Sequence, residues 1–419
     1  MVGAHPRRER LEELLGLAQN YRGWTLKQLA EALGRDPANL VPSSGVPKVD
    51  LVMRLAEVLD WQVQDVIADL LGPGDTVLVD EPAGVDSSQP PTARELRDAA
   101  LESHGAGRYA ESAALARAAY AASETSAERA IACYRELGAW DGLGRFTNAL
   151  EACRRGLAER EAPVEWRLAL RAALANAYYA LGQHVEAESV AGSVIETMSR
   201  RDAEGPVADS ALAMAWHVRG QALREQMEVG DPHEAAEIAA SAAEALVIAA
   251  ERYDQLAIEL GQDYAGMAHT ARGGLLEVEA FRRQRPAREA IQTVLDGLDA
   301  VSDVDERLGA IMLEGYGWWC IFGCNMVLRH VRDAEEAQRS MAVLTNKADE
   351  IAQRLGNWSL RERVFTMEYL RRRHGTDVER PAEDWVIDRE DIQTIAGTMG
   401  RFGRFRDIAW RILRSARLA

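Results

Sequence analysis

Apolar residues recur with helical spacing near the start of the chain. The apolar positions of residues 23–34 (GWTLKQLAEALG) follow the order i, i+3, i+4, i+7 and share one helical face: Leu26, Leu29, Ala30 and Leu33. Thr25 precedes them and is a favourable N-cap, while Gly34 suits a turn that ends the helix. The pattern predicts a short helix followed by a tight turn.

Similar patterns surround this helix. Residues 7–20, 49–59 and 62–71 each carry an apolar stripe of helical period. A further short helix is predicted directly after the turn, with Asp36 as its cap and Pro37 at its first position. Because Pro42 cannot donate a backbone hydrogen bond, we expect that helix to span only residues 37–41.

The rest of the chain is predicted to be helical after a linker. Residues 72–92 are rich in Pro, Gly, Asp and Ser and show no helical period. Three similar segments then begin at residues 107, 144 and 182: GRYAESAALARAA, GRFTNALEACRRG and GQHVEAESVAGSV. Looser segments of the same kind follow up to residues 403–416. Recurrence at a fixed period is typical of stacked helical repeats.

These patterns resemble two known families. The helices on either side of Gly34 resemble the helix-turn-helix of the XRE (Cro/phage-repressor) family, and the segments after residue 93 resemble the tetratricopeptide (TPR) repeat. The resemblance implies an all-α fold with a five-helix helix-turn-helix domain over residues 1–71, a linker over 72–92 and a TPR-like α-solenoid over 93–419.

The charge of the chain limits how strongly it could bind nucleic acid. The chain has 419 residues and a formal net charge of −17, which repels nucleic acid at long range. Residues 1–72 hold eight Lys and Arg against ten Asp and Glu, so any DNA-contacting face is thin. Seven arginines gather in residues 389–419, and we expect them to pair with acidic residues of the protein.

The sequence favours a non-enzymatic, cytoplasmic protein without metal or cofactor. It contains no phosphate-binding loop, zinc-protease or serine-hydrolase motif. Cys320 and Cys324 stand one helical turn apart, but no further metal ligands accompany them, so buried thiols are the simpler interpretation. Residues 308–328 are apolar over a length that permits a membrane span, yet Glu314 and four glycines favour a buried helix.

The XRE resemblance implies a set of DNA-contacting residues. The segment after the turn of such domains enters the major groove, and its early side chains contact base edges. Carried onto this chain, the candidates are Lys27, Gln28, Arg35, Asn39, Ser43, Ser44 and Lys48. The domain's acidic balance and Pro42 also allow a helix-turn-helix fold that no longer binds DNA. Binding to double-stranded DNA would require a homodimer that presents two half-sites.

The TPR resemblance implies a groove that binds peptides. Asn176 stands where TPR proteins often place an Asn that holds a peptide backbone, and neighbouring polar residues extend the candidate set. The set comprises Arg171, Asn176, Tyr179, His217, Gln221, Arg224, Glu314, Trp318 and Asn325. A solvent-exposed polar face, or contacts with neighbouring helices, would equally explain these positions.

Two functions remain open from the sequence. The first is a DNA-binding transcriptional regulator whose TPR-like array senses a peptide or protein ligand, as in the peptide-responsive regulators that this architecture resembles. The second is a protein–protein interaction scaffold or adaptor whose helix-turn-helix domain does not contact DNA. The sequence identifies neither the ligand nor an operator, and it does not separate activation from repression.

Overall fold

The computed structural model describes residues 5–42, 47–71, 91–200, 204–228, 231–301, 309–373 and 386–418. Nearly all of them are helical, which confirms the all-α prediction. The chain divides into two compact units. The first unit combines residues 1–88 with residues 376–419, and the second unit comprises residues 89–375.

The first unit joins the two ends of the chain. Its N-terminal part contains α1 (His5–Arg22), α2 (Leu26–Ala32), a 3-10 helix (Pro37–Asn39), α3 (Val49–Leu59) and α4 (Val63–Leu71). Its C-terminal part contains β1 (Val386–Ile387), α18 (Arg389–Met399), a 3-10 helix (Gly403–Phe405), α19 (Arg406–Ser415) and β2 (Arg417–Leu418). The two short strands pair in parallel.

The predicted helix and turn around Gly34 are confirmed at the level of local structure. The Thr25 hydroxyl accepts from the Gln28 backbone amide and the Gln28 side chain accepts from the Thr25 amide, which forms a capping box. Gly34 has φ +63°, a left-handed conformation that favours glycine. The next helix is shorter than expected, because only Pro37–Asn39 form a 3-10 turn. The assignment of an XRE domain stays a prediction.

The C-terminal segment packs on the N-terminal helices, whereas we expected it to end the repeat array. The Trp61 indole donates to the Ala396 carbonyl at 2.9 Å. Arg406 pairs with Asp65 at 2.8 Å. The Arg414 guanidinium also lies within hydrogen-bond distance of the Glu13 carboxylate. These ion pairs confirm that arginines of the C-terminal segment neutralise acidic residues of the same molecule. The segment resembled a repeat helix only because both kinds of helix are amphipathic.

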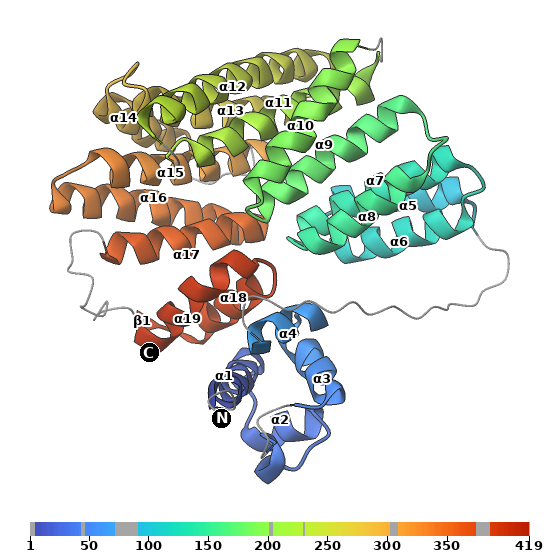
Figure 1. Cartoon of the computed structure of the whole chain (residues 1–419), viewed down its shortest axis with the longest axis vertical. Coiled ribbons are helices and arrows are strands. Elements are labelled where there is room, and N and C mark those ends of the chain that lie inside the picture. Colours follow the sequence, from blue (N-terminus) through green and yellow to red (C-terminus); the bar gives the residue numbers. More distant parts are fainter. Residues whose placement is uncertain are drawn as a thin grey trace. The chain divides into compact units, whose positions relative to one another are not determined.

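The second unit is a linear array of helices, each packed against the next along the chain (Figure 1). Its first half contains α5 (Ala93–Gly105), α6 (Tyr109–Ala122), α7 (Ser126–Gly142), α8 (Phe146–Ala158), α9 (Val164–Ala180), α10 (His184–Arg200) and α11 (Pro206–Gln226). Its second half contains α12 (Pro232–Leu260), α13 (Asp263–Phe281), α14 (Ala287–Gly297), a 3-10 helix (Leu298–Val301), α15 (Ala310–His330), α16 (Ala334–Leu355) and α17 (Trp358–Arg373).

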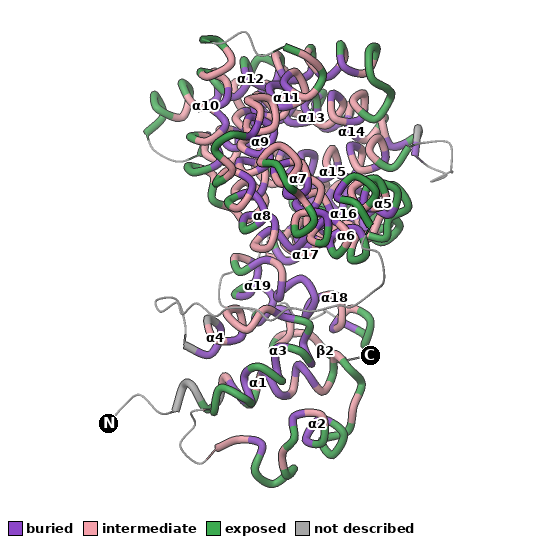
Figure 2. Tube along the Cα trace, turned by 90° about the vertical axis from the view of Figure 1, so that its right-hand side faces the viewer, coloured by how far each residue is buried: buried purple, intermediate pink, exposed green. Residues whose placement is uncertain are grey.

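The odd-numbered helices of this unit form one continuous layer. From α5 to α17, each odd-numbered helix contacts the next odd-numbered helix, whereas the even-numbered helices have no comparable mutual contacts. In a curved two-layer array the more closely spaced layer lies on the inside of the curve. We therefore call α5, α7, α9, α11, α13, α15 and α17 the inner layer. In Figure 2 buried positions, in purple, recur among the overlapping helices of this unit.

A shared turn joins the two helices of each of the first three pairs. Gly107, Gly144 and Gly182, the glycines that open the three repeated segments, all have positive φ, at +73°, +67° and +81°. In each turn the following amide donates to a carbonyl five residues earlier, at 2.8–2.9 Å. This is the hydrogen bond of a Schellman motif, which requires a left-handed residue. The repeat seen in the sequence is thus a repeated backbone turn.

Replacing Gly107 with alanine is expected to lower the free energy of unfolding by about 1 kcal/mol, because L-residues are strained at positive φ. Gly192 is the matched control, since neither glycine has an atom within 4 Å of the added Cβ and Gly192 lies inside helix α10. Gly192→Ala should raise the free energy of unfolding by up to about 1 kcal/mol. Urea denaturation of both variants measures the difference. Equal effects of the same sign would contradict a turn-specific role.

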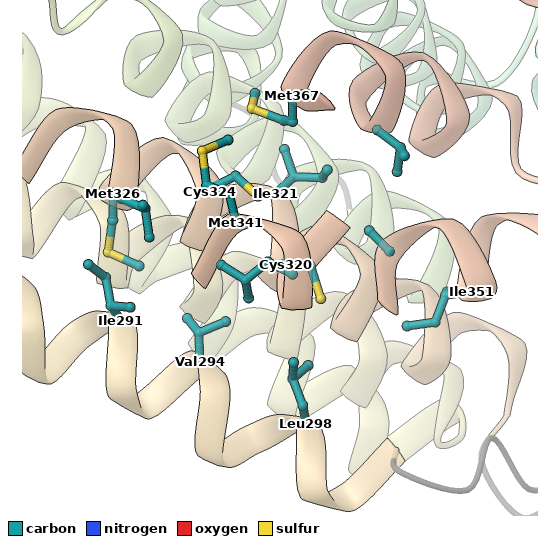
Figure 3. Packing of buried hydrophobic residues seen from close by; sticks show 14 of the residues in the cluster. Ile291, Val294, Leu298, Cys320, Ile321, Cys324, Met326, Met341, Ile351 and Met367 are labelled. Carbon is teal, nitrogen blue, oxygen red and sulfur yellow. The ribbon is translucent and has the colours of Figure 1, made fainter. Parts of the chain in front are cut away.

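A large apolar cluster fills the space between α14, α15 and α16 (Figure 3). Cys320 and Cys324 lie in it beside Ile291, Val294 and Met341, and both cysteines are fully buried. Burial raises the pKa of the Cys320 thiol to about 12. The apolar segment over residues 308–328 is therefore a packed helix of the array within its described part.

Candidate functional site

A buried polar network crosses the inner layer, and Arg224 of α11 stands at its centre. One guanidinium nitrogen of Arg224 donates to Glu277 Oε2 of α13 at 2.8 Å. The other donates to Glu225 Oε1 at 2.7 Å and to the Tyr179 hydroxyl of α9 at 3.2 Å. The side chains of Arg224 and Glu277 are only 2% and 1% exposed. A buried pair of this kind needs full hydrogen bonding to offset its lost hydration.

Further side chains complete this network from α15 and α17. Arg363 Nη2 donates to Glu225 at 2.8 Å. Asn325 Nδ2 and Arg329 Nη1 donate to Glu277 at 3.2 and 3.3 Å. Burial alone would raise the pKa of Glu225, but Arg363 and Arg224 hold it well below its usual range. Glu225 and Glu277 therefore each have two arginine partners in this network.

The structure brings together four residues that the sequence proposed as a peptide-binding set: Tyr179, Gln221, Arg224 and Asn325. Their partners, however, belong to the protein itself. Gln221 and Arg224 are buried, and the Gln221 side-chain oxygen accepts from Arg224 at 2.8 Å. Arg224 donates from Nε and both Nη atoms to partners within the protein, so it joins neighbouring repeats and is not free to hold a peptide backbone. Gln221 is buried beside it, and its Nε2 has no hydrogen-bond partner among the described residues. Gln221 and Arg224 share one helical face, as their spacing predicts, but that face is buried and is not exposed to solvent.

His217 lies outside this network, in aromatic packing. Its ring contacts the Tyr253 ring edge to face, with 5.7 Å between the centroids. Burial, with a smaller effect of Arg224, lowers the pKa of His217 to about 4. The residue is therefore a neutral aromatic side chain near pH 7, and the structure gives no support for a charged contact with a ligand.

Glu314 and Trp318 come together near the start of α15. The Trp318 indole donates to Glu314 Oε1 at 3.1 Å, and the Asn357 side-chain amide donates to the same oxygen at 2.8 Å. Burial raises the pKa of Glu314, and these two hydrogen bonds only partly oppose that effect. Glu314 has no cationic partner among the described residues.

A second carboxylate, Asp141 at the end of α7, interacts electrostatically with Glu314. Asp141 is accessible to solvent, yet the surrounding protein and the Glu314 carboxylate raise its pKa to about 7. It has no cationic partner within the described ranges either. By contrast, the buried carboxylate of Glu136 on the same helix is matched by Arg117 and Arg155. Asp141 and Glu314 are therefore two carboxyl groups that interact electrostatically and lack a cationic partner among the described residues, and they are called the acid pair below.

Aromatic side chains accompany the acid pair. Glu314 and Asp141 both raise the pKa of Tyr109, after burial, and Asp141 also contributes to the raised pKa of Tyr134. Tyr134 packs edge to face on Trp166 at 5.5 Å. The sequence did not identify Asp141, Tyr109 or Tyr134 as site residues, because no pattern along the chain relates residues of α7 to residues of α15.

The acid pair predicts a defined pH dependence of stability. Asp141 keeps its proton in the folded protein up to about pH 7, whereas the unfolded chain releases it near its ordinary pKa of 3.8. Because the folded state then binds more protons, this group makes stability fall as the pH rises through that window. Asp141→Asn is expected to raise the melting temperature at pH 8 relative to the native protein and to leave it nearly unchanged at pH 4.

Glu161→Gln, which removes an exposed carboxylate of the α8–α9 turn, is the control for this pH experiment. It should shift the melting temperature by less than Asp141→Asn at pH 8. A lowered melting temperature of Asp141→Asn at pH 8 would contradict the raised pKa.

Two further predicted residues lie on inner-layer helix α9. Arg171 and Asn176 are half-buried. No hydrogen bond of either side chain is found in the described part of the structure, so both can offer donors to a ligand. Their role in binding a peptide stays a prediction.

The proposed DNA-contacting residues of the first unit are mostly exposed. Lys27, Gln28, Asn39 and Lys48 are accessible, but the Gln28 side chain is engaged in the capping box. Arg35 Nη2 donates to Asp50 at 2.6 Å, which offsets its charge. Ser43 and Ser44 lie outside the described residues. No continuous helix follows the turn, since the segment after Asp36 forms a 3-10 turn of three residues.

Neither a metal cluster nor a membrane helix is found among the residues described. No group of three His, Cys, Asp or Glu side chains there could hold a metal ion. No described helix combines the length and apolar character that crossing a bilayer requires.

No protein-family profile and no curated protein matches the chain. Among solved structures, a tetratricopeptide repeat protein from Parabacteroides merdae ATCC 43184 is 13% identical, with a TM-score of 0.32 over 73% of this chain and 98% of that chain.

Proposed function

We propose that this chain is a non-enzymatic protein- or peptide-binding module whose inner layer recognises a basic segment of its partner. The observation that carries the proposal is the acid pair, Asp141 and Glu314, which lacks a cationic partner among the described residues. A Lys or Arg side chain placed between the two carboxylates would supply the missing positive charge. Tyr109 and Tyr134 would contact its apolar stem.

The neighbouring charges support a basic partner over an acidic one. The buried arginines of the inner layer already pair with Glu225 and Glu277, so they offer little attraction to an acidic peptide. The net charge of −17 attracts basic partners at long range. Arg171 and Asn176 would hold backbone carbonyls of the same peptide from α9.

An array of random twelve-residue peptides tests the proposal. Bound peptides should be enriched in Lys and Arg, and binding should weaken with salt. Asp141→Asn combined with Glu314→Gln should reduce the affinity for a selected peptide at least about tenfold, as expected for loss of a charge-assisted contact. Glu161→Gln is the control and should leave the affinity within twofold. An unchanged affinity of the double variant would refute the proposal.

Contact with double-stranded DNA is the second candidate function. The observation that favours it is the exposure of Lys27, Asn39 and Lys48, which carry no ion pair in the described structure. The Arg35–Asp50 pair and the short 3-10 turn weaken it. A first unit that contacts DNA, together with the helical array, would make the protein a regulator that senses a peptide or protein. A homodimer would present two DNA-contacting faces.

Fluorescence anisotropy with a random-sequence duplex tests DNA contact. Because few phosphates could be neutralised, binding should be weak and fall with salt, and Lys27→Gln with Lys48→Gln should abolish it. No salt-dependent binding at 50 mM salt would leave the interaction module as the only supported function.

A further inference from the structure

A pocket of about 470 Å³ lies in the second unit, between the C-terminal ends of α13 and α15 and the start of α14. Arg283 and Arg329 line one part of it, together with His330. Phe281, Pro286 and Ala287 supply apolar surface beside them. The pocket shares no lining residue with the acid pair, so it does not depend on the function proposed above.

Among the described residues of the second unit, Arg283 occupies a left-handed backbone position that is otherwise taken by glycine. It has φ +59°, and the next amide donates to the carbonyl of Glu279 at 2.9 Å. This is the turn that Gly107, Gly144 and Gly182 form in the earlier pairs. An arginine there costs conformational energy that glycine would not. A non-glycine residue with a left-handed backbone conformation at the rim of a cavity suggests that its side chain is needed there.

The charges around the pocket leave Arg283 as the unmatched cation among its described lining residues. Arg329 Nη1 pairs with Glu277 at 3.3 Å, and its Nε lies within hydrogen-bond distance of Glu228. Arg285 pairs with Glu279 and Glu289 at 3.0 and 3.2 Å. No acidic partner of Arg283 is found in the described part of the chain. A pocket lining with one unpaired cation favours a ligand that carries one negative charge.

Two neutral donors stand beside this cation. His330 Nε2 is buried and has no hydrogen-bond partner in the described structure. Burial, and then Arg329, lower the pKa of His330, so it is neutral near pH 7. Helix α14 begins at the pocket, with Pro286 as its N-cap and no side chain that caps its first amides. Free amides at a helix start favour an anion.

From this arrangement we infer that the pocket binds a small monocarboxylate that carries a short apolar group. The carboxylate would lie between Arg283, His330 and the first amides of α14, and the apolar group would contact Phe281 and Pro286. A dianionic phosphate is less suitable, because only one cation of the lining lacks an acidic partner and Glu228 and Glu289 lie nearby.

Ligand-observed NMR on the full chain tests this inference with three probes: N-acetylvaline, its uncharged amide, and inorganic phosphate. N-acetylvaline should bind with a dissociation constant on the order of 1 mM, as expected for a ligand of this size. The amide and phosphate should bind at least about tenfold more weakly. Equal binding of acid and amide, or tighter binding of phosphate, would overturn the inference.

Variants of Arg283 separate the role of its charge from the stability of the turn. Arg283→Gly should keep the fold, with a melting temperature equal to or about 2 °C above that of the native protein, and should lose at least tenfold in affinity for N-acetylvaline. Arg283→Lys should retain most of the affinity. Arg332→Gln, which removes an exposed cation outside the pocket lining, is the control and should change the affinity less than twofold. Native affinity in Arg283→Gly would refute the site.

Discussion

Glu277→Ala is expected to lower the free energy of unfolding of the second unit by about 3–5 kcal/mol, because it leaves the buried Arg224 guanidinium without its main counter-charge. Asn325 and Arg329 lose an acceptor in the same variant, which adds to the cost. Urea denaturation followed by far-UV circular dichroism measures the loss. The array should become less stable without a change in its helical content under native conditions.

A control variant and a double variant test whether the loss of stability comes from the unpaired buried charge. Glu289→Ala removes a carboxylate from an exposed pair with Arg285, and its cost should stay below about 1 kcal/mol. Replacing both members of the buried pair, as Arg224→Met with Glu277→Leu, should recover most of the lost stability. A cost of Glu277→Ala no larger than that of Glu289→Ala would show that the network is not a stabilising centre.

Deletion of residues 386–419 should unfold the N-terminal helices of the first unit while the array stays folded. The deletion exposes Trp61, which is 5% exposed in the intact unit, and removes its hydrogen bond to Ala396. It also leaves Asp69, whose side chain is 3% exposed, without the nearby Trp410. Hydrogen-exchange protection of α1 and α4 should fall about 100-fold or more.

The second unit provides the internal reference for that deletion. Peptides from α9 and α11 should exchange as slowly in the truncated protein as in the full chain. Trp410→Ala offers a milder form of the same change, with an intermediate loss of protection in α1 and α4. Undiminished protection of α1 in the deletion variant would show that residues 5–71 fold without the C-terminal segment.

Local structure could be predicted from the sequence wherever a short-range rule decided it. Helices 49–59 and 62–71 follow from apolar period, and the structure has them at Val49–Leu59 and Val63–Leu71. The turn at Gly34 follows from its glycine, and the recurring Gly107, Gly144 and Gly182 mark the starts of repeated segments whose turns the structure shows. The cap at Thr25 follows from residue type. Each of these depends on contacts within a few residues of the chain.

Long-range placement could not be predicted in the same way. Arg224 stands at helical spacing from His217 and Gln221. This pattern does not reveal that the Arg224 guanidinium pairs with Glu277, which lies 53 residues further on. The acid pair joins residues of α7 and α15 that no repeat pattern connects. The C-terminal helices were assigned to the array because amphipathic helices look alike until their partners are known.

The discontinuous first unit has a consequence for synthesis on the ribosome. Residues 5–71 emerge first, but α18 and α19, on which they pack, emerge more than 300 residues later. At typical elongation rates of about 5–20 residues per second, the apolar faces of α1 and α4 wait for about 15–60 s before their partners exist. During that interval the array can fold as a unit of local contacts. The nascent N-terminus is therefore the part of this protein with the longest need of protection by chaperones.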